Sequence, residues 1–362
     1  NLPAQITPET IQNKLNKENY QKDSLHTINI LEKWKIKNTI KDKKPKMVFI
    51  NTTGGGMRSA LWSFCAIQYC DSILNGKLLR QTQLISGSSG GLIGLAYLRE
   101  LMLREKRNEI SNFHESNYRN DMAKDILNKV AFYVSVNDML LRLQTFEDNG
   151  FTYRKDRGYA FEKQLNVNTR GYLNRRLSEY YTPEYNSEIP MLIVNPTIVN
   201  NGKRLIISPQ PASYLSYNRD QKNIVNNYLI ESLEFRRFFE KQGANDLQFT
   251  SALRMSSTFP YVMPIVHLPS NPEFQVMDAG LRDNFGVKNS IKFLYTFRKW
   301  ISENTSGVVF IQIRDSQKTP KTDKQEKQTF IETISVPVRT VYKNIFLTQD
   351  YDHDQLLQYM NE

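Results

Sequence analysis

The sequence of 362 residues predicts an α/β fold, and three observations carry this prediction. Two β-favouring runs, 46–51 and 82–86, each lead into a glycine-rich turn that is followed by a helix-like segment. A third run, 307–313, is continuously apolar, as expected for a strand that is buried on both faces of a parallel sheet. Strands that alternate with helices favour a three-layer α/β/α arrangement, in which helices cover both faces of a central, mostly parallel sheet.

The first glycine-rich turn is 52–56, Thr-Thr-Gly-Gly-Gly, and a helix-like segment from Met57 to Cys70 follows it. Glycines between a strand and a helix leave backbone N–H groups free to point at an anion. Such donors stabilise the oxyanion of acyl transfer, and one donor contributes ~2.7–4 kcal/mol. A phosphate cradle is the alternative, although no dinucleotide fingerprint or Walker loop follows the glycines. The candidate oxyanion-hole residues are Gly54, Gly55, Gly56 and Met57.

Arg58 lies just past this loop. Its guanidinium would suit the phosphate group of a substrate, and it would equally suit a structural ion pair. The sequence leaves both interpretations open, so Arg58 is a candidate substrate-binding residue.

The second glycine-rich turn contains the candidate nucleophile. Gly87-Ser-Ser-Gly-Gly91 follows the run 82–86 and precedes a helix-like segment, 92–104. A strand, a Gly-x-Ser-x-Gly turn and a helix form the context of a nucleophile elbow. Glycine neighbours let the strand and the helix approach closely, and the start of the helix favours developing negative charge. Ser89 is therefore the candidate nucleophile; a tight turn with incidental serines is the alternative.

A serine hydroxyl needs an adjacent base, and Asp278 is the candidate. It follows the short β-like run 274–277 and begins the glycine-containing turn Asp278-Ala-Gly280. The chain has only four histidines, and none of them lies in a recognisable catalytic motif. His267 is the one plausible member of a catalytic triad, and a structural role for it is the alternative.

Four segments occur in order between residues 46 and 290: Gly54-Gly-Gly-Met-Arg58, Gly87-Ser-Ser-Gly-Gly91, Ala252-Leu-Arg-Met-Ser-Ser-Thr-Phe-Pro-Tyr261 and Asp278-Ala-Gly-Leu-Arg-Asp-Asn284. With this combination the chain resembles the patatin-like phospholipases, and it has features similar to the catalytic domain of cytosolic phospholipase A2. The departures are Thr53, where plant-type patatins have aspartate, and Ala279, where many members have glycine. They leave the subfamily and the substrate open.

The resemblance implies a patatin-like fold with a helical cap region and a Ser–Asp dyad in place of a triad. Ser89 would be the nucleophile and Asp278 the base, while Gly55 and Gly56 with neighbouring amides would form the oxyanion hole. The implied activity is that of a lipid acyl hydrolase of the phospholipase A or lysophospholipase type, which forms an acyl-enzyme and needs no cofactor or metal ion. A lipid transacylase and a catalytically inert lipid-binding module are the alternatives.

The net charge of +11 and the pI of about 9.4 suit an anionic surface. The densest basic patches are 33–46 and 318–327, although lysine-rich loops are often merely solvated. Since no nucleic-acid motif accompanies them, we expect a phospholipid or other lipid ester as substrate, an anionic membrane surface as a candidate partner, and no nucleic acid. No run of eighteen apolar residues and no signal peptide occurs. The expected location is cytoplasmic or peripheral at a membrane, and a removed N-terminal anchor stays an open alternative.

The chain divides by composition into three parts. Residues 1–45 form a polar, partly helical N-terminal extension, and 46–314 form the catalytic domain, with 108–188 as a helical, cap-like insertion. Residues 315–362 are expected to form a mobile basic loop and a helical tail. The Asn-Gly turn at 200–202 predicts a β-hairpin with 191–195 and 203–207 as its strands.

Overall fold

The computed structural model describes residues 2–133, 144–217, 230–259, 262–316, 345–346, 348–356 and 358. Several sequence predictions fall partly outside these residues. The basic loop at the start of 315–362 is described only for Asp315 and Ser316, and the patch 318–327 lies wholly outside. Pro260 and Tyr261, at the end of the third family-like segment, also lie outside.

Four strands form the central sheet: β2 (Met47–Thr52), β3 (Thr82–Gly87), β6 (Met191–Val194) and β13 (Val308–Ile313). Their order is β13-β2-β3-β6, and every neighbouring pair is parallel. The predicted strands at 46–51 and 82–86 are thus confirmed. The expectation that 307–313 is buried on both faces is wrong: among the described residues β13 pairs with β2 alone, and it is only partly buried along most of its length.

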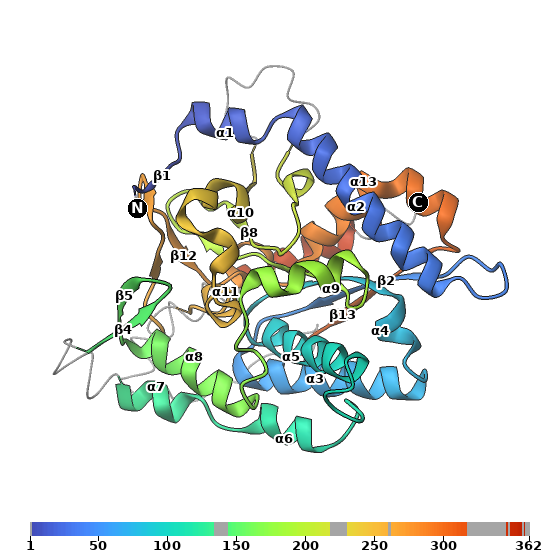
Figure 1. The fold of residues 1–362 in the computed structure, drawn as a ribbon, viewed down its shortest axis with the longest axis horizontal. Coiled ribbons are helices and arrows are strands. Elements are labelled where there is room, and N and C mark those ends of the chain that lie inside the picture. Colours follow the sequence, from blue (N-terminus) through green and yellow to red (C-terminus); the bar gives the residue numbers. More distant parts are fainter. Residues whose placement is uncertain are drawn as a thin grey trace.

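Four helices cover this sheet: α2 (Lys17–Asn38), α3 (Gly56–Ile73), α5 (Ser89–Lys106) and α13 (Val287–Asn304). Successive side chains of a strand point to opposite faces. Accordingly, Val48 and Ile50 of β2 lie in the core that α3 and α5 complete. Met47 and Phe49 lie in a second core with residues of α2 and α13, such as Trp34. Figure 1 shows the two helix pairs on opposite sides of the sheet, which confirms the three-layer α/β/α fold.

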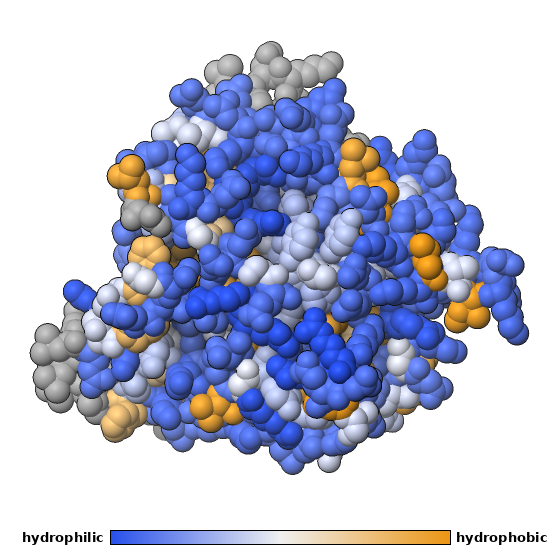
Figure 2. Space-filling model, viewed as in Figure 1, coloured by the Kyte–Doolittle hydropathy of each residue, from blue (hydrophilic) through white to orange (hydrophobic). Residues whose placement is uncertain are grey.

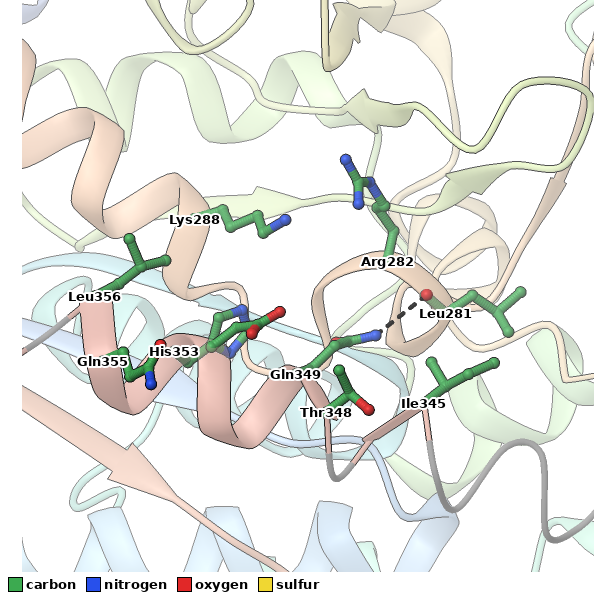
Figure 3. Close-up of a pocket in the computed structure, with 10 residues that line it drawn as sticks. Leu281, Arg282, Lys288, Ile345, Thr348, Gln349, His353, Gln355 and Leu356 are labelled. Carbon is green, nitrogen blue, oxygen red and sulfur yellow. Dashed lines mark hydrogen bonds between the residues drawn. The ribbon is translucent and has the colours of Figure 1, made fainter.

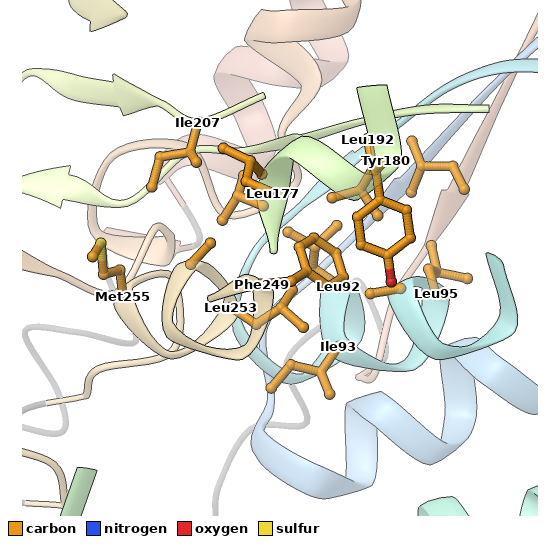
Figure 4. Packing of buried hydrophobic residues seen from close by; sticks show 14 of the residues in the cluster. Leu92, Ile93, Leu95, Leu177, Tyr180, Leu192, Ile207, Phe249, Leu253 and Met255 are labelled. Atoms are coloured by element: carbon orange, nitrogen blue, oxygen red, sulfur yellow. The ribbon is translucent and has the colours of Figure 1, made fainter. Parts of the chain in front are cut away.

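The helix that follows the candidate nucleophile, α5, is buried along most of its length. Its Leu92 and Leu95 pack near Leu192 of β6 and Phe249 of α11 (Phe249–Met255), as Figure 4 shows. A buried charge must be paired, and the Arg99 guanidinium of α5 pairs with the carboxylate of Glu184. The first residue of α5, Ser89, therefore starts a helix that is held rigidly by its surroundings.

A second sheet has the order β10-β12-β7-β8-β9, and its β12 (Gln275–Met277) ends directly before Asp278. The predicted hairpin is only partly confirmed: its second strand is β8 (Arg204–Ile206), but the first is β7 (Thr197–Ile198), because 191–194 forms β6 of the central sheet and meets the second strand at the isolated bridge Val194–Ile207. Gly202 in its turn has φ +67° and donates its N–H to the Ile198 carbonyl at 2.9 Å. The outer strands of this sheet are β9 (Ser232–Glu234) and β10 (Val266–His267).

The N-terminal residues are part of the packed fold. Leu31 and Trp34 of α2 are buried against the sheet, because their helix covers one of its faces. The short β1 (Ala4–Gln5) pairs in parallel with β11 (Ser270–Asn271). The predicted extension 1–45 therefore contributes a helical layer to the fold.

The segment 108–188 is mainly helical but also contains a small β-hairpin. Its elements are α6 (Asn117–Ala123), α7 (Leu127–Tyr133), β4 (Thr145–Asp148), β5 (Phe151–Arg154), α8 (Arg157–Asn168) and α9 (Tyr181–Tyr185). Figure 1 places α7, α8 and this hairpin together at one end of the molecule. Further α-helices in the described residues are α1 (Pro8–Lys14), α4 (Lys77–Gln81), α10 (Phe235–Phe238) and α12 (Gly280–Asp283).

The surface agrees with the basic, polar composition. Figure 2 shows one face that is mainly hydrophilic, with apolar residues in small separated groups. Among the described residues, no helix combines the length and the apolar character that crossing a membrane would require.

The close packing of α5 on α3 depends on a glycine, and replacing it tests this packing. A Cβ atom at position 94 would lie 2.1 Å from the carbonyl oxygen of Ala60 in α3. Gly94→Ala should therefore lower the free energy of unfolding by about 1–3 kcal/mol in urea denaturation. An exposed helical control, Ser72→Ala, should change it by less than about 0.5 kcal/mol. A gain in stability at Gly94, as helix propensity alone would give, would contradict the packing.

Candidate active site

Ser89 lies at the junction of β3 and α5, as the sequence predicts. Its φ of +50° is in the left-handed region, which a residue other than glycine rarely adopts without support from its surroundings. The next residue must be glycine, since a Cβ at Gly90 would lie 1.8 Å from the carbonyl oxygen of Gly56. The strained serine thus stands between the sheet and the first turn of a buried helix, directly beside the glycine loop.

Asp278 reaches the same place from the end of β12. Its carboxylate accepts a hydrogen bond from the N–H of Gly280 at 2.7 Å. Burial raises the pKa of this carboxyl to about 6, and the Gly280 N–H and the interaction with the Ser89 side chain only partly oppose the shift. The structure therefore brings together the two residues that the sequence selected separately as nucleophile and base.

The segment that begins at Ala252 connects these two residues through the main chain. The carbonyl of Ser256 accepts the N–H of Ser89 at 3.1 Å and the N–H of Ala279 at 3.2 Å. The carbonyl of Thr258 accepts the N–H of Asp278 at 2.9 Å. These three bonds give a physical reason for the third family-like segment, because it fixes the positions of the serine and the aspartate relative to each other.

The glycine loop forms the start of α3. Gly55 and Gly56 have φ values of +143° and +64°, which glycine adopts without strain. The first N–H groups of a helix have no partner within it, so the amides of Gly56 and Met57 can face a ligand. The Gly54 amide differs from the prediction, since it already donates to Oδ1 of Asn284 at 3.1 Å.

Asn284 was missed as a site residue by the sequence reasoning. Its Oδ1 also accepts a hydrogen bond from the Ser88 hydroxyl at 3.0 Å, so one side chain holds both the glycine loop and the serine turn. Its own N–H donates to Oε1 of Gln349 at 2.7 Å. The only signal in the sequence was its place at the end of the motif that begins at Asp278.

Arg58 forms an ion pair in this structure. Its Nη2 lies 2.8 Å from Oδ2 of Asp315, while the Arg58 side chain remains 75% exposed. Asp315 follows β13 and donates its N–H to the Thr53 hydroxyl at 3.2 Å. Its carboxylate lies against Gly55, where an added Cβ would be 2.2 Å from Oδ2. Nothing in the sequence around Asp315 indicated that it would lie beside the loop.

The four histidines lie in other environments. Within the described ranges, no hydrogen bond or ion pair joins a histidine to Ser89 or Asp278, and no cluster of three or more His, Cys, Asp or Glu residues could hold a metal ion. His267, the candidate triad member, has a side chain that is 53% exposed and pairs with Glu273 at 3.0 Å. Its position therefore fits the structural alternative.

Comparison with known proteins identifies the family. A model of the patatin-like phospholipase family matches residues 52–290, more than half of the chain. The chain therefore belongs to the patatin-like phospholipases, as its four motifs predict. A comparison with curated protein sequences gave no match.

Several solved structures are similar to the chain at low identity. Human GIVD cytosolic phospholipase A2 with methyl γ-linolenyl fluorophosphonate is 17% identical over 58% of this chain and 29% of that one, with a TM-score of 0.30. A second structure of that enzyme, with the inhibitor and terbium chloride, is 15% identical over 85% and 45%, with a TM-score of 0.35. VipD from Legionella pneumophila is 11% identical over 67% and 47%, with a TM-score of 0.30. The chain spans less than half the length of each of these.

The raised pKa of Asp278 makes a prediction for stability. Its unfolded carboxyl ionises near the ordinary value of 3.8, whereas the folded one keeps its proton to about 6. Ionisation therefore disfavours folding, and stability is lost as the pH rises between these two values. In Asp278→Asn this loss should be absent, so the variant should gain on the order of 2–3 kcal/mol relative to wild type between about pH 4 and pH 7.

Urea unfolding of both proteins across this pH range measures the difference. Asp352→Asn removes the same charge at an exposed carboxylate and serves as the control. A constant difference between wild type and Asp278→Asn at all pH values would contradict the raised pKa.

Proposed function

We propose that this chain is a lipid acyl hydrolase of the phospholipase A or lysophospholipase type, which cleaves carboxylic esters through Ser89 and Asp278. The observation that carries the proposal is the interaction of the Ser89 side chain with the buried Asp278 carboxylate, two residues whose backbones are held by the carbonyls of Ser256 and Thr258. It joins a serine on a strained strand-to-helix turn to a carboxyl group of raised pKa. Membership of the family supports a lipid ester as the substrate class.

In this proposal Asp278 is the general base. Above about pH 6 its carboxylate is mainly ionised, and its raised pKa makes it a stronger base than an exposed aspartate. It takes the proton from Oγ of Ser89 while Oγ attacks the carbonyl carbon of the ester. Since the two side chains already interact in this structure, the proton has a short way to travel from donor to acceptor.

The developing oxyanion is stabilised by backbone amides of the glycine loop. Gly55, Gly56 and Met57 are the proposed donors, because the Gly54 amide is engaged by Asn284. When the tetrahedral intermediate collapses, the ester C–O bond breaks and the leaving alcohol takes the proton from Asp278. A water molecule, deprotonated by Asp278, then attacks the acyl-enzyme, releasing the fatty acid and restoring Ser89.

The charged surroundings suit a phospholipid. The exposed Arg58 guanidinium is held by the single carboxylate of Asp315, and a substrate phosphate with comparable or greater charge would compete for it. A net charge of +11 favours a peripheral position at an anionic membrane surface. In this arrangement the segment 108–188 would serve as the cap beside the bound acyl chain.

Two substitutions test the proposal. Ser89→Ala and Asp278→Asn should each lower the rate of phospholipid ester hydrolysis by at least about 10³-fold, because each removes one half of the dyad. Release of fatty acid from phosphatidylcholine and lysophosphatidylcholine is the measurement, and circular dichroism checks that each variant is folded. The control Ser72→Ala, at an exposed serine of α3, should retain full activity. An Asp278→Asn variant with wild-type turnover would exclude Asp278 as the base.

A further inference from the structure

A pocket of about 740 Å³ lies outside the candidate active site. One wall is formed by α12 and the start of α13, and the other by the helical residues 348–356 (Figure 3). The lining is mixed in character, with cationic, amide and aliphatic side chains. The residues used below are Leu281, Arg282, Lys288, Ile345, Gln349 and Leu356.

Cationic side chains without partners face this pocket. Figure 3 shows the charged ends of Arg282 and Lys288 directed toward the same space. Lys292 follows Lys288 by one helical turn on α13. Across the described part of the chain, none of these three side chains has a hydrogen bond or an ion pair, and Nε of Arg282 is buried. This is unusual, because a desolvated charge is normally paired.

The pKa values agree with the geometry. Burial lowers the pKa of the Lys288 ammonium and the nearby charge of Arg282 lowers it further, while Glu231 and Asp283 partly oppose this shift. Burial likewise lowers the pKa of Lys292 to about 8, with Arg204 adding to the effect. An anion in the pocket would relieve this repulsion and favour the charged form of each lysine.

The neighbouring carboxylates Glu231 and Asp283 only partly offset these cations, and both also face Arg204. Asp283 is buried and faces Arg204 at 3.7 Å and His353 at 3.5 Å. Glu231 lies 3.9 Å from Arg204. The remaining carboxylate, Asp352, lines the pocket but forms no ion pair with a described residue. The pocket lining therefore has two cations, Arg282 and Lys288, and one carboxylate, Asp352, none of which forms an ion pair with a described residue.

We infer that this pocket binds a ligand that carries a phosphate group, which contacts Arg282 and Lys288. A phosphate monoester has close to two negative charges and three terminal oxygens, so it can accept from several cations at once. Leu281, Ile345 and Leu356 would contact the organic part of the ligand. This inference goes beyond the proposed function, since the site is separate from Ser89.

The pocket is directly connected to the candidate active site. Gln349, in its wall, accepts the N–H of Asn284 at 2.7 Å and donates to the carbonyls of Gly280 and Leu281 at 3.0 and 3.1 Å. The same short turn carries Arg282 and begins at Asp278. A ligand that fixes Arg282 and the helical residues 348–356 therefore restrains the turn that positions the base, and we expect its binding to increase esterase activity.

Binding is measured by calorimetry on the full chain with three probes. These are inorganic phosphate, glycerol 3-phosphate, and phosphatidylcholine vesicles with or without phosphatidic acid. Arg282→Gln and Lys288→Gln should each weaken binding by about tenfold or more, since each removes a charge-assisted hydrogen bond. Lys299→Gln, an equal charge change at an exposed position on α13, should leave the affinity unchanged. Circular dichroism checks the fold of each variant.

The outcomes separate the sources of the phosphate. If the free phosphates bind saturably and both variants weaken this binding, the ligand is a soluble phosphate compound. If only the vesicles with phosphatidic acid bind, and both variants weaken this binding, the ligand is a lipid headgroup. The inference would be overturned if wild type and both variants had equal affinity, or if none of the three probes bound. The same titrations on Ser89→Ala keep this test independent of catalysis, because that variant lacks the nucleophile but retains the pocket.

Discussion

The carbonyl group of Ser256 is the point on which the candidate site depends. It accepts the amides of Ser89 and Ala279, so one backbone atom holds both the serine turn and the aspartate turn. The adjacent Thr258 carbonyl fixes Asp278 in the same way. Because these bonds involve only the main chain, the distance between the two candidate side chains is set by where α11 ends. The fold thereby brings two remote motifs to one place.

The same region stores unfavourable free energy. Ser89 has a left-handed backbone, Asp278 is buried as an acid of raised pKa, and Gly90 lies against the carbonyl of Gly56. Such features persist only where the surroundings over-determine them. Here the two cores on either face of the sheet and the buried α5 supply that support. Rigidity outside the site is therefore what makes a strained serine and a basic carboxylate possible inside it.

Local patterns in the sequence were sufficient to predict the three layers of the fold and the positions of Ser89 and Asp278. Strand, glycine-rich turn and helix occur consecutively at Ser89, and a short strand leads into Asp278, so these placements needed no tertiary information. Asn284 and Asp315 were not predicted, because each acts on a loop far away in the chain. The edge position of 307–313 was also missed, since an apolar run does not show how many neighbours its strand will have. Whether Arg58 binds phosphate is likewise decided by competition with Asp315, which the sequence does not show.

Covalent labelling tests the central claim most directly, because an activated serine reacts with a fluorophosphonate whereas an ordinary serine does not. The protein is treated with a fluorophosphonate probe, digested, and mapped by mass spectrometry. We predict one adduct, on Ser89, and strongly reduced labelling of Asp278→Asn. An adduct on Ser88, or no adduct on a folded protein that hydrolyses lipid esters, would contradict the account.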